Sequence, residues 1–449
     1  MSKIAFVGFG EVNTPIEIIV KKCKDALISL QKYGDEIIPC YPVRDDYEEK
    51  DVNRAIAELE GKSFDALVLC IAGWIPTHAV IKVVERFRNK PMVLWGLCGW
   101  IEADGRLVTT ADQAGTSALR KTMYDLGYTF KYIYDIIGVE TKSREVIEYC
   151  RAASAYAALR SQKIGQMGFR DMHLYGTMFD GPSLKRTVGA EIECFEMLEV
   201  VQRAEKFSDA EINAVIEETV KKWNFLKPAN MDVVHRGVSY YLALRDIINE
   251  RNYKAISLKD VDGMKKLLGF PPAMIFMLLA ERENIPTIPE NDCLGNVTQA
   301  IVRELTGQIG AYLEFYEFFE DGVLAGVPDY VPKEIVDGEV TVIPAAFGEL
   351  SEGILNVSKV KCGVVTMARL TVLDGEYVMH LTLGEGVTPP RWEEAGWTQP
   401  APQLPALKIL LKDTEDFADK VMCQHYIISY GDNTKIIKEF CKIAGIKII

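Results

Sequence analysis

Two secondary-structure patterns meet in the stretch PENDCLG at residues 289–295, and together they indicate an α/β fold. Before this stretch, residues 284–288 are short and apolar, as is typical of a buried strand. After it, apolar residues recur at helical spacing from Leu294, and the pattern ends at Gly307, a residue that commonly caps helix C-termini. Loops between a strand and the following helix are where α/β proteins place reactive side chains. Glu290, in this loop, is therefore a candidate functional residue.

Two side chains further along the chain complete a candidate metal site. Glu314 lies in the next apolar stretch, and His425 opens another in QHYII at residues 424–428. Two carboxylates and one imidazole form a ligand set that suits Mn²⁺ or a similar divalent ion. The residues alone also allow structural interpretations. Glu290 or Asp292 serves equally well to complement a helix N-terminus, and a lone histidine is more often structural.

These residues resemble the metal-site segments of L-fucose isomerase and its L-arabinose isomerase relatives. The resemblance rests on END at residues 290–292, LTG at 305–307, Glu314 and His425. It extends to GTM at 176–178, FEMLE at 195–199 and TMAR at 366–369. It covers residues 280–325 and 362–449 well, is looser over 165–200, and concerns only the architecture before that.

The resemblance implies an aldose–ketose isomerase that acts on a pentose, or on a hexose that is deoxygenated or modified at C6, through an ene-diol intermediate. It implies that Glu290, Glu314 and His425 bind the metal and that the two glutamates are the acid/base pair. The implied cofactor is Mn²⁺, or another divalent cation such as Mg²⁺ or Co²⁺. The family has an aspartate at the position of Glu314, so this chain places the carboxylate one methylene further out.

Further residues are candidates for sugar contact. Trp74 and Trp100 are flanked by glycines in loops at strand ends, and the apolar C–H face of a sugar packs well on an aromatic ring. Covering the sheet or packing in a subunit contact is an equally good role for both. The remaining candidates are Met178, from the resemblance, and Glu11, His78 and Trp397. The resemblance also implies a homo-oligomer, a hexamer, in which a neighbouring subunit borders the active site.

The order of strand and helix patterns predicts three domains. Alternating strands and helices favour two Rossmann-like α/β domains with parallel sheets, at residues 1–163 and 164–335, the second of which carries the carboxylates. Two-residue periodicity and a predicted hairpin turn at Asp374-Gly375 then indicate a smaller antiparallel, barrel-like β domain at residues 336–449, which carries the histidine.

Two other functions compete with an isomerase. The turn Gly8-x-Gly10 after the first strand invites a dinucleotide-binding site and hence an NAD-dependent oxidoreductase. Its third glycine, however, is replaced by Asn13. Two α/β lobes also occur in non-catalytic sugar-binding proteins. Retained sugar affinity in a Glu290→Gln variant, with no loss of any turnover, would favour such a binding protein.

Composition excludes several classes of protein. The net charge is −13 and lysine and arginine form no basic stripe, so nucleic acid is not expected as a partner. No apolar run approaches the roughly 20 residues that span a bilayer, so no membrane segment is expected. The ten cysteines form no Cys-x-x-Cys pair, and a reducing cytoplasm is the expected location.

Overall fold

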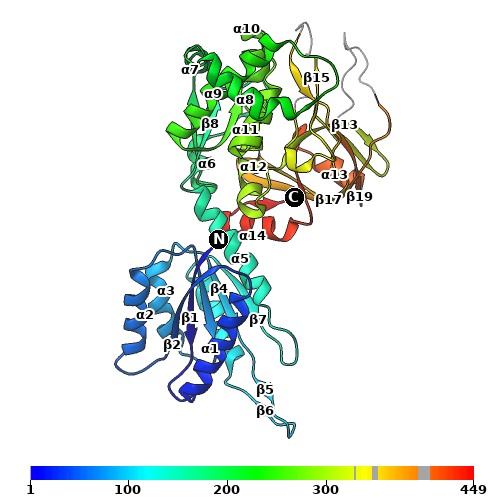
Figure 1. The fold of residues 1–449 in the computed structure, drawn as a ribbon. Coiled ribbons are helices and arrows are strands. Elements are labelled where there is room, and N and C mark those ends of the chain that lie inside the picture. The colour runs from blue at the N-terminus through cyan, green and yellow to red at the C-terminus, as the bar shows by residue number, and fades with distance from the viewer. Residues whose placement is uncertain (1, 328–329, 346–351, 393–404) are drawn as a thin grey trace. The chain divides into compact units, whose positions relative to one another are not determined.

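The structure is a computed structural model that describes residues 2–327, 330–345, 352–392 and 405–449. The chain forms two compact units, Met1–Ala157 and Ala158–Ile449, and helix α5 (Ser143–Leu159) runs across the boundary between them (Figure 1). The boundaries of the three predicted domains stay predictions.

The first unit is built on a five-stranded parallel sheet in the order β2-β1-β3-β4-β7. Its strands are β1 (Lys3–Phe9), β2 (Glu36–Val43), β3 (Ala66–Ile71), β4 (Met92–Gly96) and β7 (Phe130–Tyr134). Its helices are α1 (Ile16–Gln31), α2 (Lys50–Glu60), α3 (Thr77–Val84) and α4 (Asp112–Asp125), and a hairpin joins β5 (Trp100–Ile101) to β6 (Leu107–Val108). Every residue of β3 and β4 is buried, as expected for central strands of a sheet covered on both faces. The predicted strand–helix alternation and parallel sheet are confirmed here.

Two glycines that suggested a dinucleotide site have a packing role in this unit. A Cβ atom on Gly8 would lie 2.3 Å from Cys23 Sγ, and one on Gly10 would lie 2.7 Å from Ile19 Cδ1. Cys23 and Ile19 are buried residues of α1. The glycines thus allow α1 to approach β1 closely, which accounts for the Gly8-x-Gly10 pattern without a nucleotide.

The second unit begins with a four-stranded parallel sheet in the order β12-β11-β8-β9. Its strands are β8 (Lys163–Met167), β9 (Glu191–Phe195), β11 (Tyr253–Leu258) and β12 (Thr287–Ile288). Its helices are α6 (Gly181–Thr187), α7 (Met197–Ala204), α8 (Asp209–Glu218), α9 (Met231–Arg251), α10 (Lys266–Leu268), α11 (Ala273–Glu283) and α12 (Cys293–Thr306). The strand predicted over residues 284–288 is shorter, because Asn284 is the left-handed C-cap of α11. Gly307 ends α12 at φ 75°, as predicted.

The remainder of the second unit contains a closed antiparallel barrel of six strands in the order β17-β20-β13-β14-β19-β18, closed by pairing of β17 with β18 (Figure 1). The strands are β13 (Ala311–Phe319), β14 (Gly322–Gly326), β17 (Gly363–Leu373), β18 (Glu376–Val387), β19 (Ala406–Leu411) and β20 (His425–Tyr430), and β21 (Lys447–Ile448) adds to β18. A small sheet combines β10 (Asn224–Phe225), β15 (Thr341–Pro344) and β16 (Ile354–Asn356), and the last helices are α13 (Thr414–Lys420) and α14 (Thr434–Ala444). Strands β13 and β14 precede residue 336, so the barrel draws on chain from both sides of the predicted boundary. The antiparallel β prediction is confirmed, whereas a Rossmann-like arrangement of each α/β part stays a prediction.

Among the residues that the structure describes, no single helix combines the length and apolar composition needed to cross a membrane. The bent pair Asp260–Leu268 and Ala273–Glu283 satisfies both requirements only when its two helices are taken together.

Candidate functional site

Three acidic residues follow three neighbouring strands of the second unit's parallel sheet. Asp171 comes after β8, Asp260 comes after β11 and Glu290 comes after β12. Because parallel strands end at a common edge, these loops meet, and the Glu290 N–H donates a 2.8 Å hydrogen bond to Asp260 Oδ1. Crevices at this edge of an open α/β sheet are where such folds bind ligands.

The turn that carries Glu290 is strained and firmly held. Glu290 and Asn291 have φ values of 65° and 49°, and each left-handed residue of this kind costs about 1–2 kcal/mol. The Asn291 side chain donates to the carbonyls of Met167, at 2.8 Å, and Phe169. Asp292 caps α12 by accepting the Gly295 N–H at 3.0 Å. Strain held by several contacts is typical of functional sites.

The barrel supplies the other two predicted ligands. Glu314 on β13 and His425 on β20 are paired in the antiparallel register. Glu314 Oε2 lies 3.6 Å from His425 Nε2, and Glu290 Oε2 lies 3.6 Å from His425 Nδ1. The imidazole therefore lies between two carboxylates, and residues 290, 314 and 425 come together although they are far apart in the sequence.

His425 is rigidly placed and electrically neutral. It is 2% exposed, and its ring stacks on Tyr312 with centroids 4.1 Å apart and planes 12° apart. Burial lowers the pKa of His425 to about 3, despite the opposing field of Asp292. At neutral pH the ring consequently keeps a nitrogen lone pair that can bind a metal ion.

A buried charged network supports the ring of Tyr312. The Tyr312 hydroxyl donates to Asp292 Oδ2 at 2.9 Å, and Arg369 makes two hydrogen bonds to the Asp292 carboxylate, one of them 2.9 Å long. Asp292 and Arg369 are fully buried. Burial alone would raise the pKa of Asp292, but the Arg369 guanidinium lowers it below its usual value. Of the two carboxylates that could complement the helix N-terminus, Asp292 is the one that caps α12.

The donor types at this site suit a divalent ion with oxygen and nitrogen ligands, such as Mn²⁺. The residues that the structure describes nevertheless contain no group of three or more His, Cys, Asp or Glu side chains already arranged around one metal position. Glu290 and Glu314 lie at different nitrogens of the same imidazole, which explains this result. The residues fit a metal by chemistry and proximity.

A pocket of about 210 Å³ is lined by two of the three side chains, Glu290 and His425. Its walls combine polar and apolar groups, including Leu174, Thr177, Glu290, Tyr312, Met422 and His425. This size and this mixture suit a small polar molecule bound next to ionisable groups.

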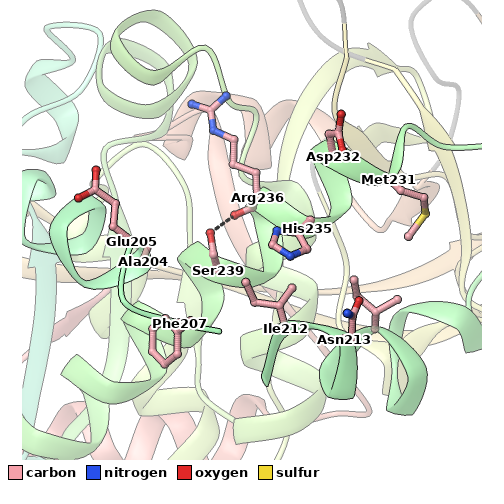
Figure 2. Close-up of a pocket in the computed structure, with 11 residues that line it drawn as sticks. Ala204, Glu205, Phe207, Ile212, Asn213, Met231, Asp232, His235, Arg236 and Ser239 are labelled. Atoms are coloured by element: carbon pink, nitrogen blue, oxygen red, sulfur yellow. Dashed lines mark hydrogen bonds between the residues drawn. The ribbon is translucent and has the colours of Figure 1, made fainter. Parts of the chain in front are cut away.

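A larger pocket of about 540 Å³ lies elsewhere, among α7, α8 and α9 (Figure 2). Apolar side chains such as Phe207 and Ile212 line it, and Figure 2 shows Glu205, Asp232 and Arg236 spread around its rim. His235 Nε2 lies 3.2 Å from Asp209 Oδ1. Because its charged groups do not converge, volume alone does not make this pocket the better candidate.

The predicted sugar contacts in the first unit lie in loops (Glu11 and Trp74), at the start of strand β5 (Trp100) and in the first turn of α3 (His78). Trp74 is 38% exposed, and its carbonyl accepts the Glu11 N–H at 2.8 Å. The Trp100 indole donates to Glu102 at 2.8 Å, and His78 is exposed in the first turn of α3. The assignment of these residues to a sugar stays a prediction.

The remaining predicted contacts were Met178 and Trp397. Met178 is 42% exposed, and its sulfur accepts a 3.5 Å hydrogen bond from Arg170. Its neighbours Gly176 and Thr177, rather than Met178, line the smaller pocket. Trp397 lies outside the described residues.

Sequence reasoning missed Asp171 and Asp260. Both are fully buried, and both follow apolar strands as Glu290 does. This position after a strand was the signal that could have identified them.

No protein-family model matches the chain. An L-arabinose isomerase of Shouchella clausii (strain KSM-K16) is 19% identical over 324 residues, which are 68% of this chain and 64% of that protein. An L-arabinose isomerase of Clavibacter sepedonicus is 21% identical over 151 residues, which are 32% of this chain and 30% of that protein. The chain thus spans less than two thirds of the length of these curated relatives. The predicted resemblance is supported as far as distant similarity to L-arabinose isomerases, and a fucose isomerase-like placement stays a prediction.

Proposed function

We propose that this protein is an aldose–ketose isomerase that acts on a pentose, or on a deoxy or C6-modified hexose. One observation carries the proposal: the His425 imidazole lies 3.6 Å from each of two carboxylates, Glu290 and Glu314, beside a pocket. Distant similarity to proteins named L-arabinose isomerase supports the same reaction class.

The two glutamates have the roles that such a reaction requires. Conversion of an aldose to a ketose moves a proton from C2 to C1 through an ene-diol. The reaction needs a protein base and a protein acid next to the sugar. Glu290 is the proposed base that removes the C2 proton and returns it at C1. Glu314, whose side chain is 28% exposed against 13% for Glu290, is the proposed acid/base that moves the proton between O2 and O1.

Glu290, Glu314 and neutral His425 would hold the proposed Mn²⁺ or related divalent cation. When bound, such an ion polarises the sugar oxygens and stabilises developing negative charge. The Tyr312 ring keeps the imidazole oriented, and the Asp292–Arg369 pair keeps Tyr312 in place.

Other predictions belong to the same proposal. Three of them are a homohexameric assembly, a site bordered by a neighbouring subunit and a cytoplasmic location. Sugar contact is also still a prediction for six residues: Glu11, Trp74, His78, Trp100, Met178 and Trp397.

A panel of aldoses and ketoses tests the function. Each sugar is incubated with Mn²⁺, Mg²⁺ or Co²⁺, with and without a chelator, and products are separated by chromatography. We expect at least one aldose–ketose pair to interconvert, with loss of turnover on chelation and recovery when the metal is restored. Absence of interconversion across a broad panel would contradict the proposal, and sugar binding that persists without turnover in both wild type and Glu290→Gln would favour a binding protein.

A further inference from the structure

We propose that Asp260 is a positioning residue that fixes Glu290 in the site, and that Lys265 holds Asp260 in place. The inference rests on the proposed role of Glu290. It concerns a residue that neither binds the metal nor contacts the sugar in the proposed mechanism.

Asp260 uses both carboxylate oxygens within the protein. Oδ1 accepts the Glu290 N–H at 2.8 Å, and Oδ2 accepts from Lys265 Nζ at 3.0 Å. The Asp260 side chain is 1% exposed and that of Lys265 is 12% exposed. Asp260 thus presents one oxygen to the Glu290 backbone and the other to Lys265, and this arrangement orients Glu290.

The hydrogen bond acts at the strained point of the turn. Glu290 has a φ of 65° and is followed by a second left-handed residue, Asn291. Conformations of this kind persist only where surrounding contacts enforce them. The contact from Asp260 is directed at the backbone of Glu290 itself, and a bond to a charged acceptor is stronger than one to a neutral acceptor. Backbone rotation at Glu290 would redirect its carboxylate away from His425.

Asp260 is itself anchored by an unusual helical turn. It begins a π-helical segment, Asp260–Lys265, so the wide turn joins residues five apart through the Asp260–Lys265 ion pair. Asp171 accepts the N–H groups of Val261 and Asp262 at 2.8 and 2.7 Å, which ties this segment to the loop after β8. Single π-helical turns recur at functional sites.

The same turn offers a matched control. Asp262 pairs with Lys266 at 2.7 Å and accepts the Met172 N–H at 2.7 Å. It thus combines a lysine and a backbone N–H, as Asp260 does, but has no hydrogen bond to Glu290 among the described residues. The Asp262→Ala variant therefore measures how much a purely structural ion pair in this turn contributes to kcat and to the Kd for Mn²⁺.

The test compares Asp260→Ala, Asp260→Asn, Lys265→Met and Asp262→Ala with the wild type in three measurements: kcat at saturating Mn²⁺, the Kd for Mn²⁺ by titration calorimetry, and the crystal structure. We expect Asp260→Ala to lower kcat by about 100-fold, as misplacement of a reacting group by about 1 Å does, and to weaken Mn²⁺ binding. Lys265→Met has a smaller effect in the same direction. Asp260→Asn retains more activity than Asp260→Ala, because its amide oxygen still accepts the Glu290 N–H, and Asp262→Ala leaves kcat and the Kd unchanged.

The crystal structure separates this inference from the proposed function. We expect Glu290 to leave its positive φ in Asp260→Ala and its carboxylate to move away from His425. If Glu290 keeps its φ and its distance from His425, or if Asp262→Ala lowers kcat as much as Asp260→Ala, the inference is overturned. If the wild type isomerises no sugar, the proposed function fails, and the position of Glu290 in the variant structures still decides the role of Asp260. Should Asp260→Ala not fold, Asp260→Asn and Lys265→Met carry the same comparison.

Discussion

Glu314 and His425 are paired across the antiparallel strands β13 and β20, and 3.6 Å separates Glu314 Oε2 from His425 Nε2. The barrel register thus fixes half of the candidate site, and the strained loop after β12 brings Glu290 to the other nitrogen of the same ring. The proposed chemistry rests on the proximity of two carboxylates to one buried imidazole.

Replacement of Glu314 by glutamine tests its proposed roles as acid/base and as metal ligand together. Glu314→Gln keeps the shape of the side chain but removes the proton-transfer group, so kcat for the sugar found in the panel should fall by about 10²–10⁴-fold. Glu317→Gln, on the same strand but exposed, is the matched control and should retain wild-type kcat. Equal activity in the two variants would exclude Glu314 from catalysis.

Arg369 should contribute strongly to stability. Arg369→Met leaves the buried Asp292 carboxylate without its ion-pair partner, and breaking such a pair costs about 3–5 kcal/mol of unfolding free energy. Urea denaturation followed by circular dichroism measures the change. Lys21→Met, which removes one partner of an exposed pair with Asp25 on α1, should change stability little. A similarly small effect of Arg369→Met would show that Asp292 is adequately solvated or protonated without it.

His380 should make stability depend on pH. Burial, with a smaller effect of Lys420, lowers its pKa to about 4 from an ordinary value of 6.5. Below pH 6.5 the unfolded chain therefore binds a proton at His380 that the folded chain does not. His380 leaves stability unchanged above pH 6.5, and the free energy of unfolding falls as pH is lowered from 6.5 toward 4. The shift corresponds to at most about 3 kcal/mol.

The measurement is the free energy of unfolding of wild type and His380→Gln between pH 7.5 and 4. Effects of the carboxylates are common to both proteins, so the difference isolates His380. Wild type should lose more stability than the variant over this range, and parallel curves would contradict the assigned shift.

Much of the fold could be predicted because its signals are local. Gly307 ends α12 in a left-handed conformation, and Asp374 and Gly375 form the turn between β17 and β18 with φ values of 52° and 83°. Strand β3 (Ala66–Ile71) consists entirely of apolar residues. Each of these features depends on periodicity or turn chemistry over a few residues.

The rest depends on contacts between distant parts of the chain. Arg369 and Asp292 are 77 residues apart, and no local pattern indicates which carboxylate the arginine meets. The stacking of Tyr312 on His425 follows from the pairing of β13 with β20. Asp260 meets Glu290 only because β11 and β12 are neighbours in the sheet. Sequence therefore identified the candidate ligands through a family resemblance, but it did not identify the residues that hold them.

Titration calorimetry with Mn²⁺ tests the central claim most directly, namely that Glu290, Glu314 and His425 share one divalent cation. Wild type and Glu317→Gln should bind one Mn²⁺ per chain with equal affinity. Glu290→Gln, Glu314→Gln and His425→Ala, each confirmed to be folded, should bind it about 100-fold more weakly or not at all. Binding of Mn²⁺ by all three variants with wild-type affinity, or no binding by the wild type, would contradict the claim.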